Sequence, residues 1–479
     1  MSLSIFDAAR RAPQADALVC DGVRLSFVEL ALRAQARQSE LTLLGVERAQ
    51  CVPVALIVEP CLALFEYLYL LLAIGVPVLP IHPRLTAPER VALLGACGVH
   101  TLLDPSRAAP ITPAPRLPDE DAPFPERQAL AFVPSSGSTG KPKIIELSRG
   151  AFLALARADA ARVPPLATDR TLLCLPLSHV GGLSVVVRAL IERRCTVVFR
   201  GPSAGLLGSL PELAQALIDE RISLLSLVPA VLARLLRAAP RIAALAPLRA
   251  VLLGGQACSA ELFSEARSHR VPVLTSYGLT EACSQVSTLC FPPPERAPVK
   301  RGVVGVGFPL DGIELRIVGD AIAVRGPTLL SGYVGQPSPF DADGFFATGD
   351  RGELDPELGL FVFGRASELI ISGGENIDPV EVEHALLACG GLSAVCVFGV
   401  PDPEFGERVA AAFEIAVSPD FDERALFAAL DERLASFKQP RLTCSFHELP
   451  RLASGKLDRA KIRAEAGPRL RARERAAGR

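Results

Sequence analysis

A polar segment containing two glycines directly follows an apolar run, and this junction restricts the folds that the chain can adopt. Residues 135–143 contain four hydroxyl side chains, two glycines and two lysines, and the apolar residues 129–133 lead straight into them. Glycine lets backbone N–H groups approach a phosphate closely, and the hydroxyl and ammonium groups supply further donors. The composition predicts a loop that binds a nucleotide triphosphate, with a flexible polar turn as the alternative. The residues assigned to this loop are Ser135, Ser136, Gly137, Ser138, Thr139, Gly140, Lys141 and Lys143.

The segment differs from the Walker A loop, in which glycine, a short spacer and then Gly-Lys-Ser/Thr precede a helix. Ser135 replaces the first glycine, and Pro142 follows Lys141 where the magnesium-binding hydroxyl would stand. Residues 144–147 favour a short strand, and a helical pattern begins only after Ser148, a suitable N-cap. The loop is therefore expected to join a strand to a strand, not a strand to a helix.

Composition excludes several classes of protein. The chain has 479 residues, enough for two or three domains, and 49% hydrophobic against 21% charged residues indicates well-buried globular cores. A net charge of −2 provides no attraction to nucleic acid or anionic membranes. Twelve cysteines without a CxxC pair are typical of reduced thiols in a cytoplasmic protein.

Targeting and membrane signals are not expected. The N-terminus lacks the basic and apolar regions of a signal peptide. The apolar segment 67–81 is interrupted by Gly75, Pro77 and Pro80 and is too short to span a bilayer. We therefore expect a cytoplasmic protein without membrane insertion, in which this segment forms core elements.

Apolar runs alternate with helical patterns up to about residue 300, which predicts layers of parallel sheet and helix. From residue 302, glycine and proline punctuate short alternating strands, which predicts a small β-barrel subdomain. Strands are expected at residues 52–58, 76–80, 172–175, 195–199, 224–228, 250–253, 271–275, 313–318 and 321–324, and helices at 27–45 and 62–73.

A third pattern begins after Arg365 and predicts a small α+β domain, with a helix at 380–387, strands at 394–400 and 408–415, and a helix at 423–434. The fold class is α/β. We divide the chain into an N-terminal domain, residues 1–364, a C-terminal domain, residues 365–465, and a disordered Arg-rich tail, residues 466–479.

Polar residues cluster where several predicted strands end, which is where α/β proteins build their sites. His179 follows one strand end, although a lone histidine is commonly a structural residue. Gly254 and Gly255, followed by Gln256, would allow the backbone to approach a flat ring such as adenine, or would merely form a tight turn.

Two acidic residues and one lysine are further candidates. Glu281 is a candidate Mg²⁺ ligand, because Mg²⁺ takes one or two carboxylates besides substrate phosphates. Asp350, after a tight turn, would accept both hydrogen bonds of a ribose diol. Lys456 stands in a Ser-Gly-Lys turn from which a long ammonium would reach across a cleft, and an ordinary exposed lysine is the alternative. The segment of Glu281 also contains Tyr277, Gly278 and Thr280.

In this order and spacing the motifs resemble the acyl-adenylate-forming superfamily of acyl-CoA synthetases, nonribosomal adenylation domains and luciferases. The resemblance extends from about residue 27 to residue 461. It implies that a large N-terminal domain and a small, mobile C-terminal domain enclose ATP and a carboxylic acid. It assigns residues 135–143 to the phosphates, Glu281 to Mg²⁺, Asp350 and Arg365 to the ribose, and Lys456 to catalysis.

The resemblance implies a reaction in two steps. The acid attacks the α-phosphate of ATP with the help of Lys456, and pyrophosphate leaves. The small domain then rotates about Ser367 and presents Gly373 and Gly374 to the thiol of coenzyme A, which forms a thioester and displaces AMP. Ser367 stands where the superfamily usually has Asp or Lys, which affects the energetics of the hinge and not the chemistry. The implied partners are the acid, ATP, Mg²⁺ and coenzyme A, and a homodimer is the assembly that we consider.

Several motifs narrow the resemblance to the o-succinylbenzoate–CoA ligase group of menaquinone synthesis. They are the run from Ser178 to Arg188 and the segments 252–256, 276–285 and 370–377. The acid of that group has a second carboxylate. Candidates to bind it are Arg188, Ser284 and Gln285, with His179 beside the acyl group. A surface arginine on a helix is the alternative for Arg188.

Other functions are compatible with parts of this pattern. Some of the motifs also occur in aryl-acid–CoA ligases, and a free-standing adenylating enzyme that loads a carrier protein would share most of them. A non-catalytic nucleotide sensor is disfavoured, because a degenerate relative would be expected to lose some of Lys456, Glu281, Asp350 and the loop lysines.

Overall fold

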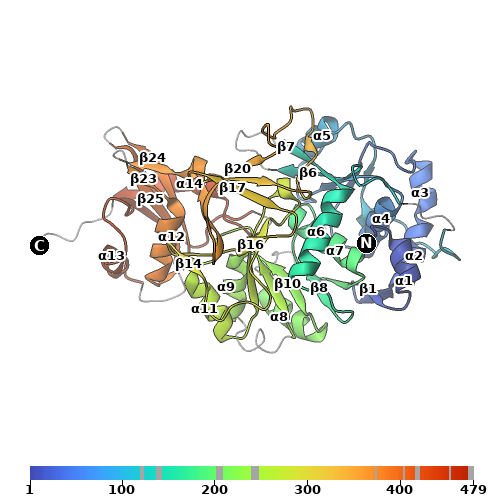
Figure 1. Cartoon of the computed structure of the whole chain (residues 1–479), viewed down its shortest axis with the longest axis horizontal. Coiled ribbons are helices and arrows are strands. Elements are labelled where there is room, and N and C mark those ends of the chain that lie inside the picture. Colours follow the sequence, from blue (N-terminus) through green and yellow to red (C-terminus); the bar gives the residue numbers. More distant parts are fainter. Residues whose placement is uncertain are drawn as a thin grey trace, which may run out of the picture.

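The chain forms two α/β sheets with their helices, a small antiparallel sheet and a C-terminal α+β unit (Figure 1). The computed structural model describes residues 1–118, 123–135, 143–200, 209–238, 247–372, 375–402, 405–415, 421–452 and 455–472. In Figure 1 the C-terminal elements lie at one end of the long axis and the N-terminal helices lie at the other.

The largest sheet has nine strands, of which the six from β12 to β1 run parallel. Its parallel strands are buried along almost their whole length, as expected where helices cover both faces of a sheet. In spatial order the strands are β16 (Phe308–Pro309), β13 (Ser287–Thr288), β12 (Val273–Tyr277), β11 (Ala250–Leu253), β10 (Leu224–Leu227), β8 (Arg170–Leu173), β9 (Cys195–Val198), β1 (Asp16–Cys20) and β2 (Val23–Ser26).

The second sheet has six strands and flanks the glycine-containing loop. β6 and β7 pair antiparallel as far as Ser135 and Lys143, so these neighbours are two strands of one sheet, as predicted. In spatial order the strands are β19 (Gly332–Tyr333), β7 (Lys143–Ser148), β6 (Ala129–Ser135), β4 (Val78–Ile81), β3 (Val54–Ile57) and β5 (Leu102–Leu103).

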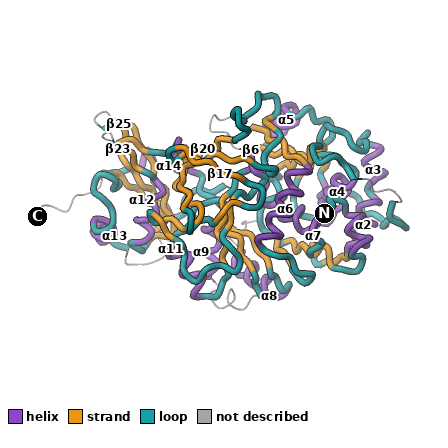
Figure 2. Tube along the Cα trace, viewed as in Figure 1, coloured by secondary structure: helices purple, strands orange, loops and turns teal. Residues whose placement is uncertain are grey.

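Helices join and cover these two sheets. α6 contacts β7 of the second sheet and also α7, which packs on β8 and β9 of the first. Figure 2 shows helices and strands interleaved along the molecule, with α6 near the middle of the view and α1–α4 at the end opposite to the C-terminal strands. The helices before residue 300 are α1 (Ile5–Arg11), α2 (Phe27–Ala36), α3 (Gln38–Leu43), α4 (Leu62–Ala73), α5 (Ala87–Ala96), α6 (Arg149–Arg162), α7 (Val180–Glu192), α8 (Leu210–Asp219), α9 (Pro229–Ala238) and α11 (Ala260–Ser268), with 3₁₀ turns η1 (Pro105–Arg107) and η3 (Thr280–Ala282).

Local sequence explains where several helices begin. Ser26 and Glu29 form a capping box at the start of α2, and the Ser148 hydroxyl accepts a hydrogen bond from the Ala151 N–H at the start of α6. The single helix expected at residues 27–45 is instead two helices, α2 and α3. They meet at Arg37, whose guanidinium is buried against Glu66 at 2.8 Å, a distant contact that helical periodicity does not reveal.

The small all-β part contains a four-stranded antiparallel sheet. Among the described residues 302–365 its edge strands β17 and β21 do not pair, so its hydrogen bonding is open and not that of a closed barrel. β21 also packs against β15 and β16. The strands are β14 (Val299–Lys300), β15 (Val303–Val304), β17 (Glu314–Val318), β18 (Ala321–Arg325), β20 (Phe346–Asp355) and β21 (Gly359–Arg365).

The C-terminal unit packs helices on a further sheet, with separate apolar clusters on the two faces. β27 pairs with β26, so the first residues of the expected disordered tail extend this sheet, and residues 473–479 lie outside the described residues. Its elements are η4 (Ala366–Glu368), β22 (Ile370–Ser372), β23 (Glu375–Ile377), α12 (Pro379–Ala388), β24 (Leu392–Asp402), β25 (Gly406–Ile415), α13 (Glu423–Asp431), β26 (Leu442–Phe446), α14 (Arg459–Ala466), η5 (Gly467–Arg469) and β27 (Arg471–Ala472). In the described part of the chain, no helix has the length and apolar character needed to cross a membrane.

Candidate active site

The predicted site residues that follow β11 and β12 meet a lysine from the C-terminal unit. β11 and β12 are parallel neighbours, so the residues after them lie at one edge of the sheet. Gly255 has φ +81, and a Cβ at this position would lie only 2.6 Å from Cε of Lys456. The lysine therefore rests directly on the turn after β11, where a side chain at residue 255 would block it.

A buried carboxylate lies beside this turn and receives two donors. Tyr277, at the end of β12, donates its hydroxyl to Oδ2 of Asp350 at 2.6 Å, and Nε of Arg365 contacts Oδ1 at 2.7 Å. Asp350 and Arg365 are cross-strand partners on β20 and β21, so the strand register holds them together. Burial raises the pKa of Asp350, while Arg365 and Tyr277 oppose this effect by stabilising the ionised form. The carboxylate is thereby oriented at the edge of the site.

Positive charge collects beside Asp350. Burial lowers the pKa of Lys456, the nearby Arg365 lowers it further, and Asp350 opposes both. A neighbouring cation disfavours a second cation unless an anion lies between them. The pair Lys456 and Arg365 is thus electrostatically suited to an anionic ligand such as a phosphate.

Glu281 occupies a second part of the site together with the end of the glycine-containing loop. The hydroxyl of Tyr333 donates to Oε1 of Glu281 at 2.9 Å, and Nζ of Lys143 lies 5.0 Å from the centre of the Tyr333 ring. Tyr333 is on β19, which pairs with β7, the strand that Lys143 begins. Sheet pairing therefore brings the loop lysine to Tyr333, and the hydroxyl of the same tyrosine reaches the candidate Mg²⁺ ligand on η3.

The composition of this part of the site limits how a cation would be held. No group of three or more His, Cys, Asp or Glu residues with metal-binding geometry occurs among the described residues. A single carboxylate such as Glu281 fits Mg²⁺ only if oxygens of a phosphate ligand complete the coordination.

The turn between Glu281 and Gln285 is strained. Cys283 and Ser284 both have positive φ, +55 and +103, which is uncommon for residues other than glycine. Gly278 faces this turn so closely that a Cβ would lie 1.5 Å from the carbonyl oxygen of Ser284. Such strain persists where surrounding contacts fix the backbone, and it is frequent at functional sites. The geometry explains why glycine stands at position 278.

The candidate residues for a second carboxylate meet around an aspartate that sequence analysis did not select. Nη1 of Arg188 lies 2.6 Å from Oδ2 of Asp159, and Nε2 of Gln285 donates to Oδ1 of Asp159 at 3.2 Å. The side chain of Arg188 is 8% exposed, so the alternative of a surface arginine is wrong. Ser284, by contrast, is only half-buried.

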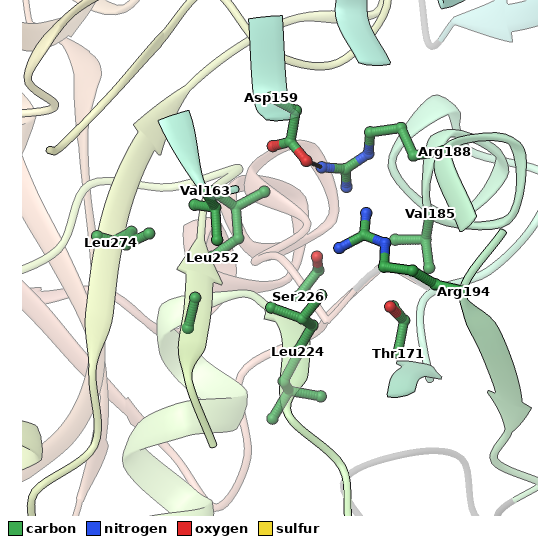
Figure 3. Close-up of a pocket in the computed structure, with 12 residues that line it drawn as sticks. Asp159, Val163, Thr171, Val185, Arg188, Arg194, Leu224, Ser226, Leu252 and Leu274 are labelled. Atoms are coloured by element: carbon green, nitrogen blue, oxygen red, sulfur yellow. Dashed lines mark ion pairs between the residues drawn. The ribbon is translucent and has the colours of Figure 1, made fainter. Parts of the chain in front are cut away.

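A cavity of about 40 Å³ lies beside this group, and two arginines face each other across it (Figure 3). Arg188 and Arg194 line it together with Asp159, Thr171 and Ser226. Nε of Arg194 and the hydroxyl of Thr171 are buried without a hydrogen-bond partner in the described part of the chain. Buried donors normally find a partner, so the cavity is suited to ordered water or to a polar ligand group.

A buried glutamate modifies the charge of this cavity. Glu192, the last residue of α7, forms an ion pair with Arg194, and both side chains are at most 5% exposed. Burial, opposed by Arg194, raises the pKa of Glu192 to about 7. Near neutral pH this carboxylate is partly protonated, so the two arginines are incompletely compensated.

The cavity lies close to the turn after β11, on which Lys456 rests. Ser226 of β10 and Leu252 of β11 line the cavity. Leu252 is two residues before Gly254, which corresponds to roughly 7 Å along a strand. The cavity therefore lies below the edge of the sheet at which Lys456 and Asp350 meet.

His179 occupies the N-cap position of α7 without a side-chain capping hydrogen bond, and it is exposed to solvent. Protein around the imidazole nevertheless lowers its pKa by burial, and the positive charges of Lys456 and then His82 lower it further. His179 therefore lies near Lys456 and is neutral at neutral pH.

Several predicted site residues give less information. Gln256 is half-buried after Gly255, and Thr280 begins η3. The backbone of Ser135 ends β6, but its side chain is outside the described part. The predicted residues that lie outside the described residues are Ser136, Gly137, Ser138, Thr139, Gly140, Lys141, Gly373 and Gly374.

Sequence reasoning missed four polar residues of the site: Tyr333, Asp159, Glu192 and Arg194. The chain has only four tyrosines, so the position of Tyr333 in a Ser-Gly-Tyr segment was a usable signal. The other three lie on or next to helices α6 and α7, where their charges resemble those of an ordinary solvated face.

Comparison with protein families identifies two matching regions. The family described as AMP-binding enzyme matches residues 5–334, and the family described as AMP-binding enzyme C-terminal domain matches residues 381–456. Lys456 is the last residue of the second match.

Individual proteins give a consistent result. The 2-succinylbenzoate–CoA ligase of Listeria monocytogenes serotype 4b is 32% identical over 473 residues, covering 95% of this chain and 97% of the relative. The enzyme of the same name from Enterococcus faecalis is 35% identical over 350 residues, covering 69% of this chain and 68% of the relative. The solved structure of o-succinylbenzoate CoA synthetase from Bacillus subtilis with the acyl-adenylate intermediate OSB-AMP has a TM-score of 0.81 at 27% identity, covering 96% of this chain and 98% of that one. The same enzyme in complex with ATP and magnesium ion has a TM-score of 0.82, also at 27% identity and with the same coverage.

Proposed function

Because the chain belongs to the AMP-binding enzyme family, we propose that it is an ATP-dependent acid–CoA ligase whose acid is o-succinylbenzoate. The observation that carries this proposal is the position of Lys456, which rests on Gly255 after β11 and lies close to the Asp350 and Arg365 pair. The products would be o-succinylbenzoyl-CoA, AMP and pyrophosphate, as required for a step of menaquinone synthesis.

In the first step a carboxylate oxygen of the acid would attack the α-phosphorus of ATP. The bond to the oxygen that bridges the α- and β-phosphates breaks, and its electron pair leaves with pyrophosphate. Nζ of Lys456 would lie between the attacking carboxylate and the α-phosphate and reduce their repulsion. Asp350 would accept hydrogen bonds from the ribose hydroxyls, and its existing contacts with Tyr277 and Arg365 would keep it oriented.

The leaving pyrophosphate requires a separate group of cations. Lys143 and the other residues of the loop 135–143 would contact it. Glu281 would hold Mg²⁺ through its carboxylate, with phosphate oxygens as further ligands. When bound, Mg²⁺ supplies charge neutralisation for the departing pyrophosphate. The contact between Glu281 and Tyr333 supports this role, because the Tyr333 hydroxyl holds one oxygen of the carboxylate in place.

In the second step the thiol sulfur of coenzyme A, as the thiolate, would attack the acyl carbon. The bond between this carbon and the AMP oxygen breaks, and AMP leaves. Lys456 would first have to withdraw. The C-terminal domain, with its predicted boundary at residue 365, would rotate about Ser367 and bring Gly373 and Gly374 to the pantetheine. His179, neutral at neutral pH, would flank the acyl group without adding a charge.

The choice of acid follows from the buried charges. Nη1 of Arg188 contacts Asp159 and its Nε donates to the Ser184 carbonyl at 3.2 Å, while the other terminal nitrogen, Nη2, points toward the cavity (Figure 3). A second carboxylate of the acid would enter this cavity, replace water and pair with Nη2. Gln285 would position Asp159 from the opposite side. An acid without the second carboxylate would leave these donors unsatisfied and bind less well.

The test is release of pyrophosphate and AMP in the presence of ATP, Mg²⁺ and coenzyme A, screened over aromatic and aliphatic acids. We expect o-succinylbenzoate to exceed benzoate and simple aliphatic acids by at least about a hundredfold in kcat/KM. A similar rate with many acids would reject the assigned substrate. Thioester formation on a carrier protein in preference to coenzyme A would favour the carrier-loading alternative.

A further inference from the structure

Lys456 lies on a hairpin whose two arms pair at Arg451 and Leu457, and the buried carboxylate of Glu414 contacts its base. Its two arms meet where the Leu452 N–H donates to the carbonyl of Lys456 at 2.8 Å. At its base, Oε2 of Glu414 accepts the Leu449 N–H at 3.0 Å and lies 3.2 Å from Nη2 of Arg451. Glu414 is on β25 of the C-terminal sheet and its side chain is 6% exposed. The position of Glu414 therefore determines the position of the hairpin.

The other oxygen of Glu414 is held from outside the C-terminal unit. Nη2 of Arg234 contacts Oε1 of Glu414 at 2.7 Å, and Nη1 of the same guanidinium lies 3.2 Å from Glu448. Arg234 is on α9, which begins directly after the turn that follows β10. One guanidinium therefore connects a helix of the large α/β unit to the base of the lysine hairpin.

The same face of α9 also supports the tip of the hairpin. A Cβ at Gly455, next to Lys456, would lie 3.2 Å from Val228 and 3.5 Å from Val231. Val231 and Arg234 are three residues apart and thus share one face of the helix. The tip of the hairpin packs on the first turn of α9, and its base is paired to the following turn.

The remaining partners of Glu414 do not depend on how the units are oriented. Ser393, Leu449 and Arg451 all lie after residue 365, so these hydrogen bonds would move with the C-terminal unit. Within the described part of the chain, Arg234 is the partner of Glu414 that comes from before residue 365. Burial would raise the pKa of Glu414, but its hydrogen bonds and the charges of Arg451 and Arg234 lower it overall, so it remains ionised at neutral pH.

We propose that Arg234 is a positioning residue for adenylate formation, which holds the hairpin so that Lys456 rests on Gly255. The inference depends on the proposed two-step reaction, in which the same contact must break before the thioester step. An exposed ion pair would contribute little. This pair differs because its carboxylate is almost fully buried and its guanidinium is only 23% exposed. Removing Arg234 leaves Glu414 satisfied inside its own unit and loosens only the orientation in which Lys456 reaches the site.

The experiment compares the two half-reactions in Arg234→Met, Arg234→Lys and the wild type. Adenylation is measured as acid-dependent ATP–pyrophosphate exchange, and thioester formation is measured from coenzyme A and supplied o-succinylbenzoyl-adenylate. Loss of an orientation-specific contact of a buried carboxylate should lower the ratio of the adenylation rate to the thioester rate on the order of tenfold. The ratio is the correct readout, because a loosened orientation slows the first step, accelerates the second, or does both.

Controls separate positioning from general damage. Arg237→Met removes an exposed arginine from the same helix and should leave the ratio unchanged. Arg234→Lys keeps one charged donor and should restore part of the ratio. Glu448→Gln, at a more exposed carboxylate, should lower the ratio only about twofold and still reports on the contact if Arg234→Met does not fold.

An unchanged ratio in Arg234→Met would overturn the proposal, whether both half-reactions keep their rates or both lose them equally with no recovery in Arg234→Lys. Failure of the proposed function has a different signature. In that case the wild type itself would show no acid-dependent exchange and no thioester from the supplied adenylate.

Discussion

The candidate site has two halves, one around Asp350 and one around Arg188, and they differ in how their buried charges are paired. Around Asp350, the carboxylate accepts from Arg365 on the paired strand β21 and from Tyr277 at the end of β12. Around Arg188, the charges come from separate elements and surround a cavity, and some buried polar atoms there have no hydrogen-bond partner among the described residues. A half that is already satisfied suits a ligand group common to a whole family. A half with unused donors depends on one particular ligand to complete it.

The energetics of the two halves differ accordingly. A buried pair is costly to form, and removing one partner is worse, because the other charge stays buried alone. In the Asp350 half the side chain of Arg365 is 52% exposed, so water can solvate its charge when Asp350 is changed and the loss of stability is smaller. In the Arg188 half both Arg188 and Asp159 are almost buried, so removing one charge should reduce both the stability of the fold and the affinity for the ligand.

The largest effect is expected at Lys456, which the proposed mechanism places between the carboxylate of the acid and the α-phosphate of ATP. Lys456→Ala should reduce adenylation by at least about a hundredfold, on the order of 3 kcal/mol, because one preorganised cation is lost from the transition state. Conversion of a supplied acyl-adenylate to thioester should persist. Rapid-quench measurement of each half-reaction checks this, with the exposed Lys461→Ala as the matched control. Equal loss of both half-reactions would contradict the assigned role.

The next largest effect is expected from a substitution that affects the Asp350 half alone. Asp350→Asn keeps the shape but removes the charge that Arg365 and Tyr277 contact, so KM for ATP should rise about thirtyfold, roughly 2 kcal/mol. The preference for o-succinylbenzoate over benzoate should not change. Steady-state kinetics with both acids measures this, and Tyr277→Phe should give a smaller rise in the same direction. A changed acid preference would mean that the two halves are not independent.

A substitution of Arg188 should affect only the Arg188 half. Arg188→Met should lower kcat/KM for o-succinylbenzoate about tenfold to thirtyfold, while activity with benzoate and KM for ATP stay nearly constant. Arg188→Lys should recover little, since a single ammonium does not replace the planar donors. The measurement is competition between the two acids, and urea unfolding shows whether the unpaired Asp159 also reduces stability. An equal decrease with both acids would remove Arg188 from the acid pocket.

The smallest effect is a dependence of stability on pH. The pKa of Glu192 is raised in the fold, from 4.5 to about 7, so the folded protein binds this proton more tightly than the unfolded chain does. Its stabilising contribution is complete below about pH 4.5 and declines as pH rises to about 7. Glu192→Gln remains uncharged, so it should gain stability relative to the wild type across this range, on the order of 1 kcal/mol. Urea midpoints of both proteins at about pH 5 and about pH 8 test the sign. A difference that is constant with pH would contradict the assignment.

The comparison also shows which features a sequence reveals. β11 and α4 have the bounds that their apolar patterns predict, because buried parallel strands and a largely apolar helix depend mainly on local residues. Asp350 and Arg365 were found because each stands in a short recognisable motif, and strand register then pairs them. The break between α2 and α3 was not predicted, because it depends on the burial of Arg37 against Glu66 on another helix.

The Arg188 half could be predicted only in part from the sequence. Arg188 and Gln285 stand in recognisable segments, but their common partner Asp159 is 126 residues from Gln285 along the chain. Its position follows from the packing of α6 against α7, which no local pattern specifies. The same holds for Glu281 and Tyr333, which lie 52 residues apart in the chain and are joined by a hydrogen bond between their side chains.

The most direct test of the account follows an oxygen atom. The acid is supplied with isotopically heavy oxygen in its carboxylates, together with ATP, Mg²⁺ and coenzyme A, and the nucleotide and phosphate products are analysed by mass spectrometry. Attack of the carboxylate on the α-phosphate, followed by thioester formation, predicts one heavy oxygen in each AMP and none in pyrophosphate. Heavy oxygen in inorganic phosphate, with ADP as the nucleotide product, would show transfer of the γ-phosphoryl group and contradict the account.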